Sequence, residues 1–182
     1  MVEFLTLAPH MNIHQLYSKI DDFQNQQRDS LKAQYQCKNG CSRCCHTDIS
    51  VFEIEKTNLL LWFQSLSSVQ KHELNGKWNL PRAEGACAFL RNDSCTVYEA
   101  RPLICRTQGL AMLFNEDEQP FLDICPLNES ALEDIEENEI LNLDLLNNIL
   151  AQMEQQDAKN TDRDRTRLED LQKALIAGIK DE

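Results

Sequence analysis

The chain has 182 residues, 8 of them cysteines, and a formal net charge of −12 at pH 7. Residues 126–182 hold 6 basic and 15 acidic residues, which accounts for −9 of that charge. An acidic chain without a basic stripe is poorly suited to binding nucleic acid, and no apolar stretch approaches the roughly 20 residues that span a bilayer. We therefore expect no nucleic-acid partner and no membrane partner.

The N-terminal sequence predicts a cytoplasmic protein. It has no basic segment, and its short apolar run is broken by Thr6, so we expect no secretory signal. In a reducing compartment, clustered cysteines indicate metal or redox sites before disulfides. At this length, folding buries roughly 70% of the surface of the unfolded chain, enough for a core that does not depend on metal alone.

The first predicted element is an amphipathic helix from His10 to about Gln36, because apolar residues recur every three or four positions. These residues are Ile13, Leu16, Tyr17, Ile20, Phe23 and Leu31. The turn signal Asn39-Gly40 ends any helix there, and Ser42 is placed to cap a short turn that carries Cys44 and Cys45.

The middle of the chain alternates short elements. We predict a short extended piece at 47–52, helices at Glu53–Ser65 and Ser68–Trp78, and a strand around Ala88–Leu90 before a tight Asn-Asp-Ser turn. Arg101-Pro102 limits Val97–Ala100 to one helical turn. A strand at Thr107–Phe114 and an acidic loop at 115–120 follow.

The C-terminal part is predicted to be helical from residue 126. Its apolar face would comprise Leu132, Ile135, Ile140, Leu143, Leu146, Leu150 and Met153. A hydrated linker near 155–162 precedes a last helix at Asp164–Ile179, with one apolar stripe formed by Leu168, Leu171, Leu175 and Ile179.

These elements predict a mainly α fold with a small irregular β and loop core rich in cysteine, a helix-dominated α+β class. We divide the chain into an N-terminal amphipathic helix (1–36), a cysteine-cluster metal-binding core (37–125) and an acidic helical C-terminal extension that packs on the core (126–182).

The cysteines predict a metal site, because thiolates brought within about 2.3 Å of one centre bind soft or borderline metals. Four lie in one nine-residue segment and four in the next 80 residues. The candidate ligands are Cys37, Cys41, Cys44, Cys45, Cys87, Cys95, Cys105 and Cys125. We expect Cys37, Cys41, Cys44 and one later cysteine to be the direct ligands of the metal, with Gly40 letting the backbone approach it. Adjacent side chains diverge, so Cys44 and Cys45 are hard to place on one ion.

Other residues near the cysteines have candidate supporting roles. The positive charges of Arg43, Arg101 and Arg106 would lower thiol pKa values. His46 is a candidate ligand or donor to one, whereas His10, His14 and His72 are expected to be ordinary helical residues. Phe89 and Tyr98 are expected to exclude water from the site or to pack in loops, and Pro102 to fix the approach of Cys105.

The motifs resemble those of a known family. Cys37-x3-Cys41-x2-Cys44-Cys45, then Cys87-Ala-Phe-Leu, then Cys95-Thr-Val-Tyr98-Glu-Ala-Arg101-Pro102-Leu-Ile-Cys105-Arg106 are similar to the YkgJ-type cysteine-cluster family, a zinc- or iron-chelating domain. The resemblance covers about residues 37–125 and implies a metal-binding cysteine cluster. Members are often labelled iron–sulfur oxidoreductases, and flagellin lysine methylases carry a similar module.

The irregular gaps between the later cysteines favour an iron–sulfur cluster over zinc, since structural zinc sites usually use two compact cysteine pairs. The function we predict is an iron or iron–sulfur protein for electron transfer or redox chemistry, with an unknown protein partner or electron donor or acceptor. A zinc-binding structural protein is the alternative. A thiol redox enzyme using Cys41-x-x-Cys44, or part of a protein-lysine methylation system, is the second alternative, and no catalytic residue is assigned.

Overall fold

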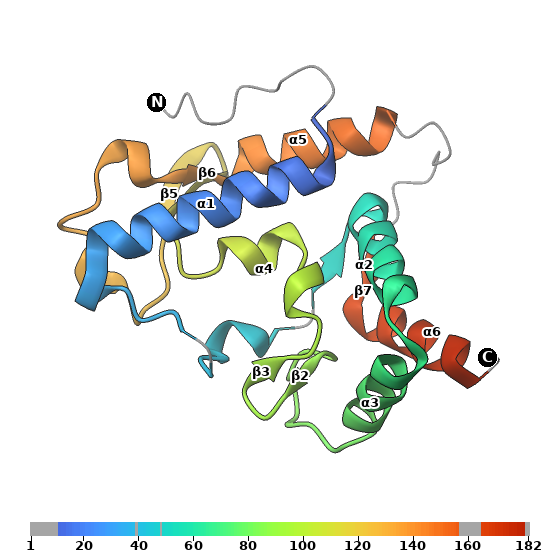
Figure 1. The fold of residues 1–182 in the computed structure, drawn as a ribbon. Coiled ribbons are helices and arrows are strands. Elements are labelled where there is room, and N and C mark those ends of the chain that lie inside the picture. Colours follow the sequence, from blue (N-terminus) through green and yellow to red (C-terminus); the bar gives the residue numbers. More distant parts are fainter. Residues whose placement is uncertain (1–10, 39, 48, 157–164, 181–182) are drawn as a thin grey trace. The chain divides into compact units, whose positions relative to one another are not determined.

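The computed structural model describes residues 11–38, 40–47, 49–156 and 165–180. In those ranges it has six α-helices and a few short strands, so the predicted helix-dominated α+β class is confirmed. The chain forms two compact units (Figure 1), each made of two stretches of sequence: unit 1 comprises Met1–Lys38 with Leu103–Asp157, and unit 2 comprises Asn39–Pro102 with Ala158–Glu182. The division into segments at residues 36 and 125 stays a prediction.

Unit 1 begins with the predicted amphipathic helix, α1 (Ile13–Leu31). Asn12 caps it, because its side chain accepts the Gln15 N–H at 3.0 Å while the Gln15 side chain accepts the Asn12 N–H at 2.9 Å. The helix ends earlier than predicted, since Lys32 has a positive φ of 44° and only a 3₁₀ turn, η2 (Lys32–Gln34), follows. The predicted start, His10, lies outside the described residues.

The short helix α4 (Leu103–Thr107) packs on α1 within unit 1. Buried Arg106 joins them: its Nη1 lies 2.5 Å from Asp21 Oδ2, and its guanidinium stacks 4.3 Å from the centre of the Tyr17 ring. The sequence predicted a strand at Thr107–Phe114, but the chain stays helical to Thr107 and becomes extended only in β4 (Met112–Glu116).

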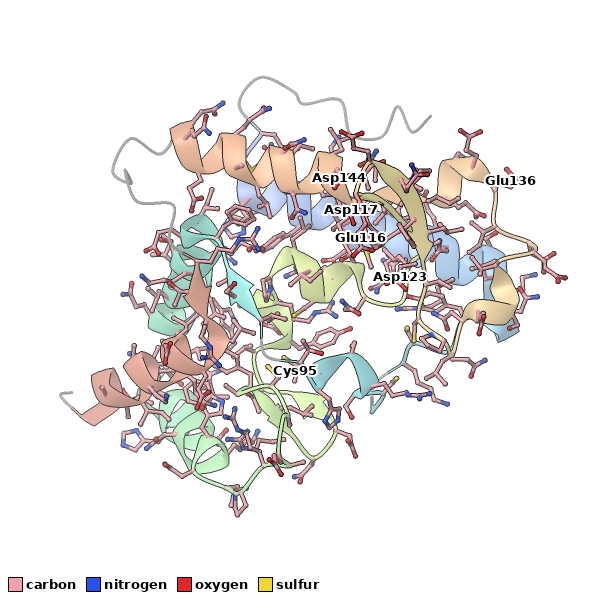
Figure 2. The ribbon with its side chains drawn as sticks, turned by 180° about the vertical axis from the view of Figure 1, so that it is seen from behind. Cys95, Glu116, Asp117, Asp123, Glu136 and Asp144 are labelled. Carbon is pink, nitrogen blue, oxygen red and sulfur yellow. The ribbon has the colours of Figure 1, made fainter. Side chains whose placement is uncertain are left out.

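Strand β4 is the centre of a three-stranded sheet in unit 1. It pairs antiparallel with β5 (Gln119–Asp123) and parallel with β6 (Leu141–Asn142). The predicted acidic loop at 115–120 is therefore wrong: it is a hairpin whose turn residues Asp117 and Glu118 have φ values of 49° and 63°. Figure 2 shows the acidic side chains of Glu116, Asp117 and Asp123 along this hairpin, with Asp144 beside them.

The prediction of helix from residue 126 onward is wrong up to residue 142. The chain forms two 3₁₀ turns, η5 (Glu129–Ala131) and η6 (Glu137–Glu139), before β6 and then α5 (Leu143–Gln156). Long-range partners hold this stretch, since Gln27 Nε2 donates to the Glu139 carbonyl at 2.8 Å. Three of the predicted apolar-face residues are buried on α5, namely Leu146, Leu150 and Met153.

Unit 2 contains the two helices predicted after the cysteine cluster, α2 (Glu53–Ser65) and α3 (Ser68–Trp78), both at the predicted residues. The short extended piece is also present, as β1 (Ser50–Val51), which pairs antiparallel with β7 (Thr166–Arg167). Figure 1 shows α2, α3 and α6 (Leu168–Lys180) gathered in this unit, where α6 contacts both of the other helices.

The predicted stripe of the last helix lies in the core of unit 2. Its members are Leu168, Leu171, Leu175 and Ile179, which pack with buried residues of α2, α3 and the following loop. The predicted helix start at Asp164 lies outside the described residues, as does most of the predicted linker. No helix in the described part of the chain has the length and apolar character needed to cross a membrane.

A small hairpin follows α3 in unit 2. It consists of β2 (Leu90–Arg91) and β3 (Ser94–Cys95), so the strand lies slightly later than predicted, while the predicted turn is confirmed by the positive φ values of Asn92 and Asp93. Buried Arg91 anchors the hairpin by donating to four carbonyl groups, those of Lys77, Trp78, Ala88 and Leu90. This anchor ties the hairpin that carries Cys95 to the end of α3.

Candidate metal centre

In unit 2, the cysteine cluster ends in a 3₁₀ turn, η3 (Arg43–Cys45), which follows Cys41. The predicted turn is confirmed, and the Cys45 N–H closes it on the Ser42 carbonyl at 2.8 Å. The Ser42 hydroxyl does not cap the turn. It donates instead to Asp93 Oδ1 at 2.7 Å, which attaches the cysteine turn to the β2–β3 hairpin.

Backbone hydrogen bonds bring two later cysteines, Cys87 and Cys95, next to the turn that carries Cys44 and Cys45. The Cys87 N–H donates to the Cys45 carbonyl at 2.7 Å, and the Leu90 N–H donates to the Cys87 carbonyl at 3.0 Å. Leu90 pairs with Cys95 across the hairpin, where Figure 2 labels Cys95. Three separated segments thus contribute Cys44, Cys45, Cys87 and Cys95, which we name the four-cysteine group.

The adjacent thiols of this group interact directly, although we expected their side chains to diverge. The Cys45 thiol hydrogen-bonds to the sulfur of Cys44, and this bond is the main cause that lowers the pKa of Cys44 to about 6. The same bond, followed by burial and by the charges of Cys44, Cys87 and Cys95, raises the pKa of Cys45. These opposite shifts favour a single thiolate on the pair, on exposed Cys44, with the other proton on Cys45.

Arg101 supplies positive charge to the four-cysteine group. It contributes to the low pKa of Cys44 and partly offsets the burial that raises the pKa of Cys95 to about 11. Its guanidinium stacks 3.6 Å from the centre of the Tyr98 ring, and its Nε donates to the Tyr98 carbonyl at 3.0 Å. The predicted electrostatic role of an arginine is thus present at Arg101.

Several expected supporting residues have other positions. Phe89 is buried in the core of unit 2, edge-on to Trp78, whereas the Tyr98 side chain is 55% exposed, so it does not seal the group from water. His46 is exposed at the end of the 3₁₀ turn. Gly40 has a φ of 88°, which favours glycine, and apart from its chain neighbours no described atom lies within 4 Å of where a Cβ would be, so its predicted approach to a metal stays a prediction.

In unit 1, a close approach occurs at a different glycine. A Cβ added to Gly109, which has a φ of 93°, would overlap the sulfur of Cys37. Asn128 lies on the same sulfur, with its Nδ2 donating to Cys37 Sγ at 3.4 Å. Backbone of residue 109 and an amide of residue 128 therefore enclose a sulfur that lies more than 70 residues away in the sequence.

Asn128 connects the loops that carry the unit 1 cysteines. Its side chain, fully buried, accepts the Gln36 N–H at 2.8 Å and donates to the Gly109 carbonyl at 2.8 Å, and its own N–H donates to the Cys125 carbonyl at 2.7 Å. Cys105 lies on α4 and is half-buried, as are Cys37 and Cys125. The sequence contained no local signal for Asn128.

Tyr35 completes the surroundings of Cys37. Its hydroxyl is buried, with Cys37 and Gln24 beside it. Burial and then the charge of Cys37 raise the pKa of Tyr35, so the hydroxyl keeps its proton. We name Tyr35, Cys37, Gly109 and Asn128 the Cys37 group.

The residue types suit a metal bound by thiolates, but the distances between the sulfurs in this structure do not yet form a metal site. Several sulfurs meet beside a cation in unit 2, and no disulfide joins any of the eight cysteines, all of which are described. In the described ranges, no three histidine, cysteine, aspartate or glutamate side chains lie in an arrangement that could hold one metal ion. Binding would therefore draw the sulfurs closer together.

The grouped thiols define a cysteine-rich class of protein. Residues 36–126 match the family "CxxCxxCC: Putative zinc- or iron-chelating domain". The match spans half of the chain, so the chain belongs to this family, and the predicted resemblance is confirmed. A search of the curated proteins and a search of the solved structures each returned no match.

Proposed function

We propose that the protein holds an iron–sulfur cluster, or iron in another form, through cysteine thiolates and serves in electron transfer. The observation that carries this proposal is the meeting of Cys44, Cys45, Cys87 and Cys95 in unit 2. The family supports chelation of zinc or iron, and our choice of iron is the finer step. A bound cluster would supply one-electron transfer, while the protein residues hold the sulfurs and offset their charge.

Ligand spacing and charge favour iron–sulfur over zinc. Structural zinc sites are usually built from two compact cysteine pairs, whereas this group combines one adjacent pair with two cysteines that are separated by 7 residues in the sequence. A cluster with four thiolates is anionic, and the positive charge of Arg101 lowers the pKa values of Cys44 and Cys95, which stabilises their thiolates. These features suit a cluster whose potential is set by neighbouring charge.

Zinc is the alternative that the same donors allow, because four thiolates also form closed structural zinc sites. In that case the four-cysteine group would hold the β2–β3 hairpin against the cysteine turn, and no redox role would follow. The two functions differ in colour, in sulfide content and in the metal retained.

The test is anaerobic purification of the full chain, followed by metal analysis, an acid-labile sulfide assay and a visible spectrum. Iron with sulfide and a broad visible absorption supports the proposal. Colourless protein with stoichiometric zinc supports the alternative, and folded protein that binds neither metal contradicts both.

A matched pair of cysteine variants tests the ligand set. We expect Cys95→Ser to lose most of the metal, because Cys95 belongs to the four-cysteine group. Cys41→Ser should retain it, since no contact described for this chain links the Cys41 sulfur to the group. The opposite result would favour the ligands expected from the sequence, namely Cys37, Cys41 and Cys44.

Thiols of this kind stay reduced in a reducing compartment, which supports our proposal of a cytoplasmic location. An electron donor or acceptor of unidentified structure is the partner that this function requires. Fractionation of cells and thiol counting under native conditions test the location.

A further inference from the structure

The hairpin of β4 and β5 in unit 1 carries an aromatic pair that is partly open to solvent. Phe114 and Phe121 lie opposite each other in the strand register, and their rings stack with centroids 6.1 Å apart. Phe121 is 47% exposed, and every residue of β5 is exposed. Strand β5 is also an edge of its sheet, with β4 on one side only. The Phe121 ring therefore contributes little to the core of unit 1 and is available for contacts with another molecule.

Carboxylates flank the aromatic pair on the same face of the hairpin. Alternate residues of a strand point to one face, so Glu116 shares the face of Phe114, and Asp123 shares the face of Phe121. The register places these two carboxylates on opposite sides of the ring pair, each about 7 Å from it along the strands. Figure 2 labels both of them on the hairpin. We name Phe114, Glu116, Phe121 and Asp123 the hairpin face.

Unit 1 carries the whole net charge of the chain. Its second stretch, Leu103–Asp157, holds 13 acidic residues and 1 basic residue, whereas the rest of the chain holds 17 of each. The one basic residue, Arg106, is buried and paired with Asp21. Within the described ranges, no basic side chain forms a salt bridge with Glu116 or Asp123. These carboxylates are therefore available to cations from outside the chain.

The combination of ring and carboxylates on the hairpin face indicates the chemistry of an occupant. Charge on an edge strand has an ordinary role, because it keeps the edges of different molecules apart. That role accounts for Glu116 and Asp123 but not for the exposed ring between them. A ring face attracts a cation, and carboxylates accept hydrogen bonds from lysine and arginine. A second copy of this chain would bring the same negative charge, so it is disfavoured as the occupant.

We propose that the hairpin face binds a basic segment of another protein, in an extended conformation with lysine or arginine at alternate positions. One basic side chain would lie over the Phe121 ring. Those two positions before and after it would reach Glu116 and Asp123, because alternate residues have the same spacing in the segment and in the hairpin. This binding does not depend on the metal that the cysteines hold, so it stands or fails separately from the proposed function.

The experiment titrates the full, reduced chain with two synthetic peptides and follows the backbone amides by NMR. The first peptide, Lys-Ser-Arg-Ser-Lys, has its basic residues at alternate positions. The second, Ser-Lys-Arg-Lys-Ser, has the same composition and charge with the basic residues contiguous. We expect the first peptide to cause saturable shifts at the amides of β4 and β5 and to bind more tightly than the second. Equal binding of the two would mean that net charge alone attracts them, which would overturn the proposal, as would no binding of the first.

Two matched pairs of variants test the hairpin face itself. Phe121 and Leu122 are neighbours, 47% and 48% exposed, but they point to opposite faces of β5. Phe121→Ala should weaken binding of the first peptide about 2- to 5-fold, as for an exposed contact between a cation and a ring, and Leu122→Ala should not. Glu116→Gln should weaken it by up to about 5-fold. Glu133→Gln removes an equal charge from an exposed position outside the hairpin and should leave binding unchanged. Equal effects within either pair would contradict the proposal.

Two controls keep the test valid. Phe121→Tyr preserves the ring and should bind the first peptide like the parent chain, and thermal unfolding by circular dichroism checks that each variant is folded. If Phe121→Tyr loses binding while folded, the ring is not the contact and the proposal fails. Sedimentation of the parent chain tests the other occupant: a dimer that Phe121→Ala dissociates would assign the hairpin face to a second copy and overturn the proposal.

Discussion

The Cys37 group in unit 1 and the four-cysteine group in unit 2 surround sulfur in different ways. Cys37 meets the amide of Asn128, the hydroxyl of Tyr35 and the backbone at Gly109, all neutral groups. Cys44 meets a second thiol and the charge of Arg101, and it is exposed. The half-buried sulfur of Cys37 thus meets fixed dipoles, whereas the exposed sulfur of Cys44 meets a shared proton and a cation.

The difference has a consequence for stability. The neutral contacts of Cys37 also hold the loops of unit 1 together, so changing them should cost folding free energy. The contacts of Cys44 lie on an exposed turn, so changing them should alter reactivity more than stability. Three predictions test this contrast, beginning with the largest expected effect.

Asn128→Ala should destabilise the protein by about 3–5 kcal/mol, because it takes the donor away from the buried Gly109 carbonyl and removes the contacts of the Asn128 side chain with the Gln36 N–H and the Cys37 sulfur. Chemical denaturation of the metal-free chain gives the free energy of unfolding. The matched control is Asn115→Ala, an exposed asparagine that contacts Asp144 and should cost under about 1 kcal/mol. Equal losses in the two variants would contradict the special role of Asn128.

Gly109→Ala and Gly40→Ala compare two glycines with similar positive φ values, 93° and 88°. Both variants pay for left-handed backbone, about 1–2 kcal/mol. Only the Cβ at 109 meets the Cys37 sulfur, so that variant should lose a further 1–3 kcal/mol or so. Thermal and denaturant unfolding measure both, and a loss at 40 as large as at 109 would argue against the close approach to Cys37.

The smallest effect concerns the reactivity of Cys44. In the metal-free protein, alkylation of Cys44 should reach half its maximal rate near pH 6, because the thiolate reacts and its pKa is lowered to about 6. Removing either cause raises the pKa and moves the midpoint to higher pH. Cys45→Ala should move it further than Arg101→Gln, since the Cys45 hydrogen bond is the larger cause.

Mass spectrometry of the Cys44 peptide across a pH series measures these midpoints. Asp93→Ala is a useful comparison, because it removes the Ser42 contact but leaves the Arg101 guanidinium and the Cys45 thiol in place. If the parent chain showed a midpoint near the pKa of an ordinary cysteine, the proposed interaction between Cys44 and Cys45 would be contradicted.

Elements with strong local signals were predictable from the sequence. Helix α3 begins where Ser67 and Gln70 form a capping box, and α2 carries acidic residues in its first turn, so both were assigned at their exact residues. The β4–β5 hairpin was missed because Asp117 and Glu118 take the positive φ values that are usual for glycine and asparagine. Residues 126–142 were misassigned because distant partners, and not local periodicity, decide their structure.

The sequence alone determined the chemistry of this protein: eight thiols grouped in one stretch, arginines close to them, and a family motif that chelates zinc or iron. Only the tertiary structure decided which groups surround each sulfur. Tyr35, Gly109 and Asn128 have no local pattern that ties them to Cys37, because their contacts join backbone and side chains up to 91 residues apart. Ligand identity is a property of residue type, whereas the environment that makes a thiol a thiolate exists only once the loops have folded together.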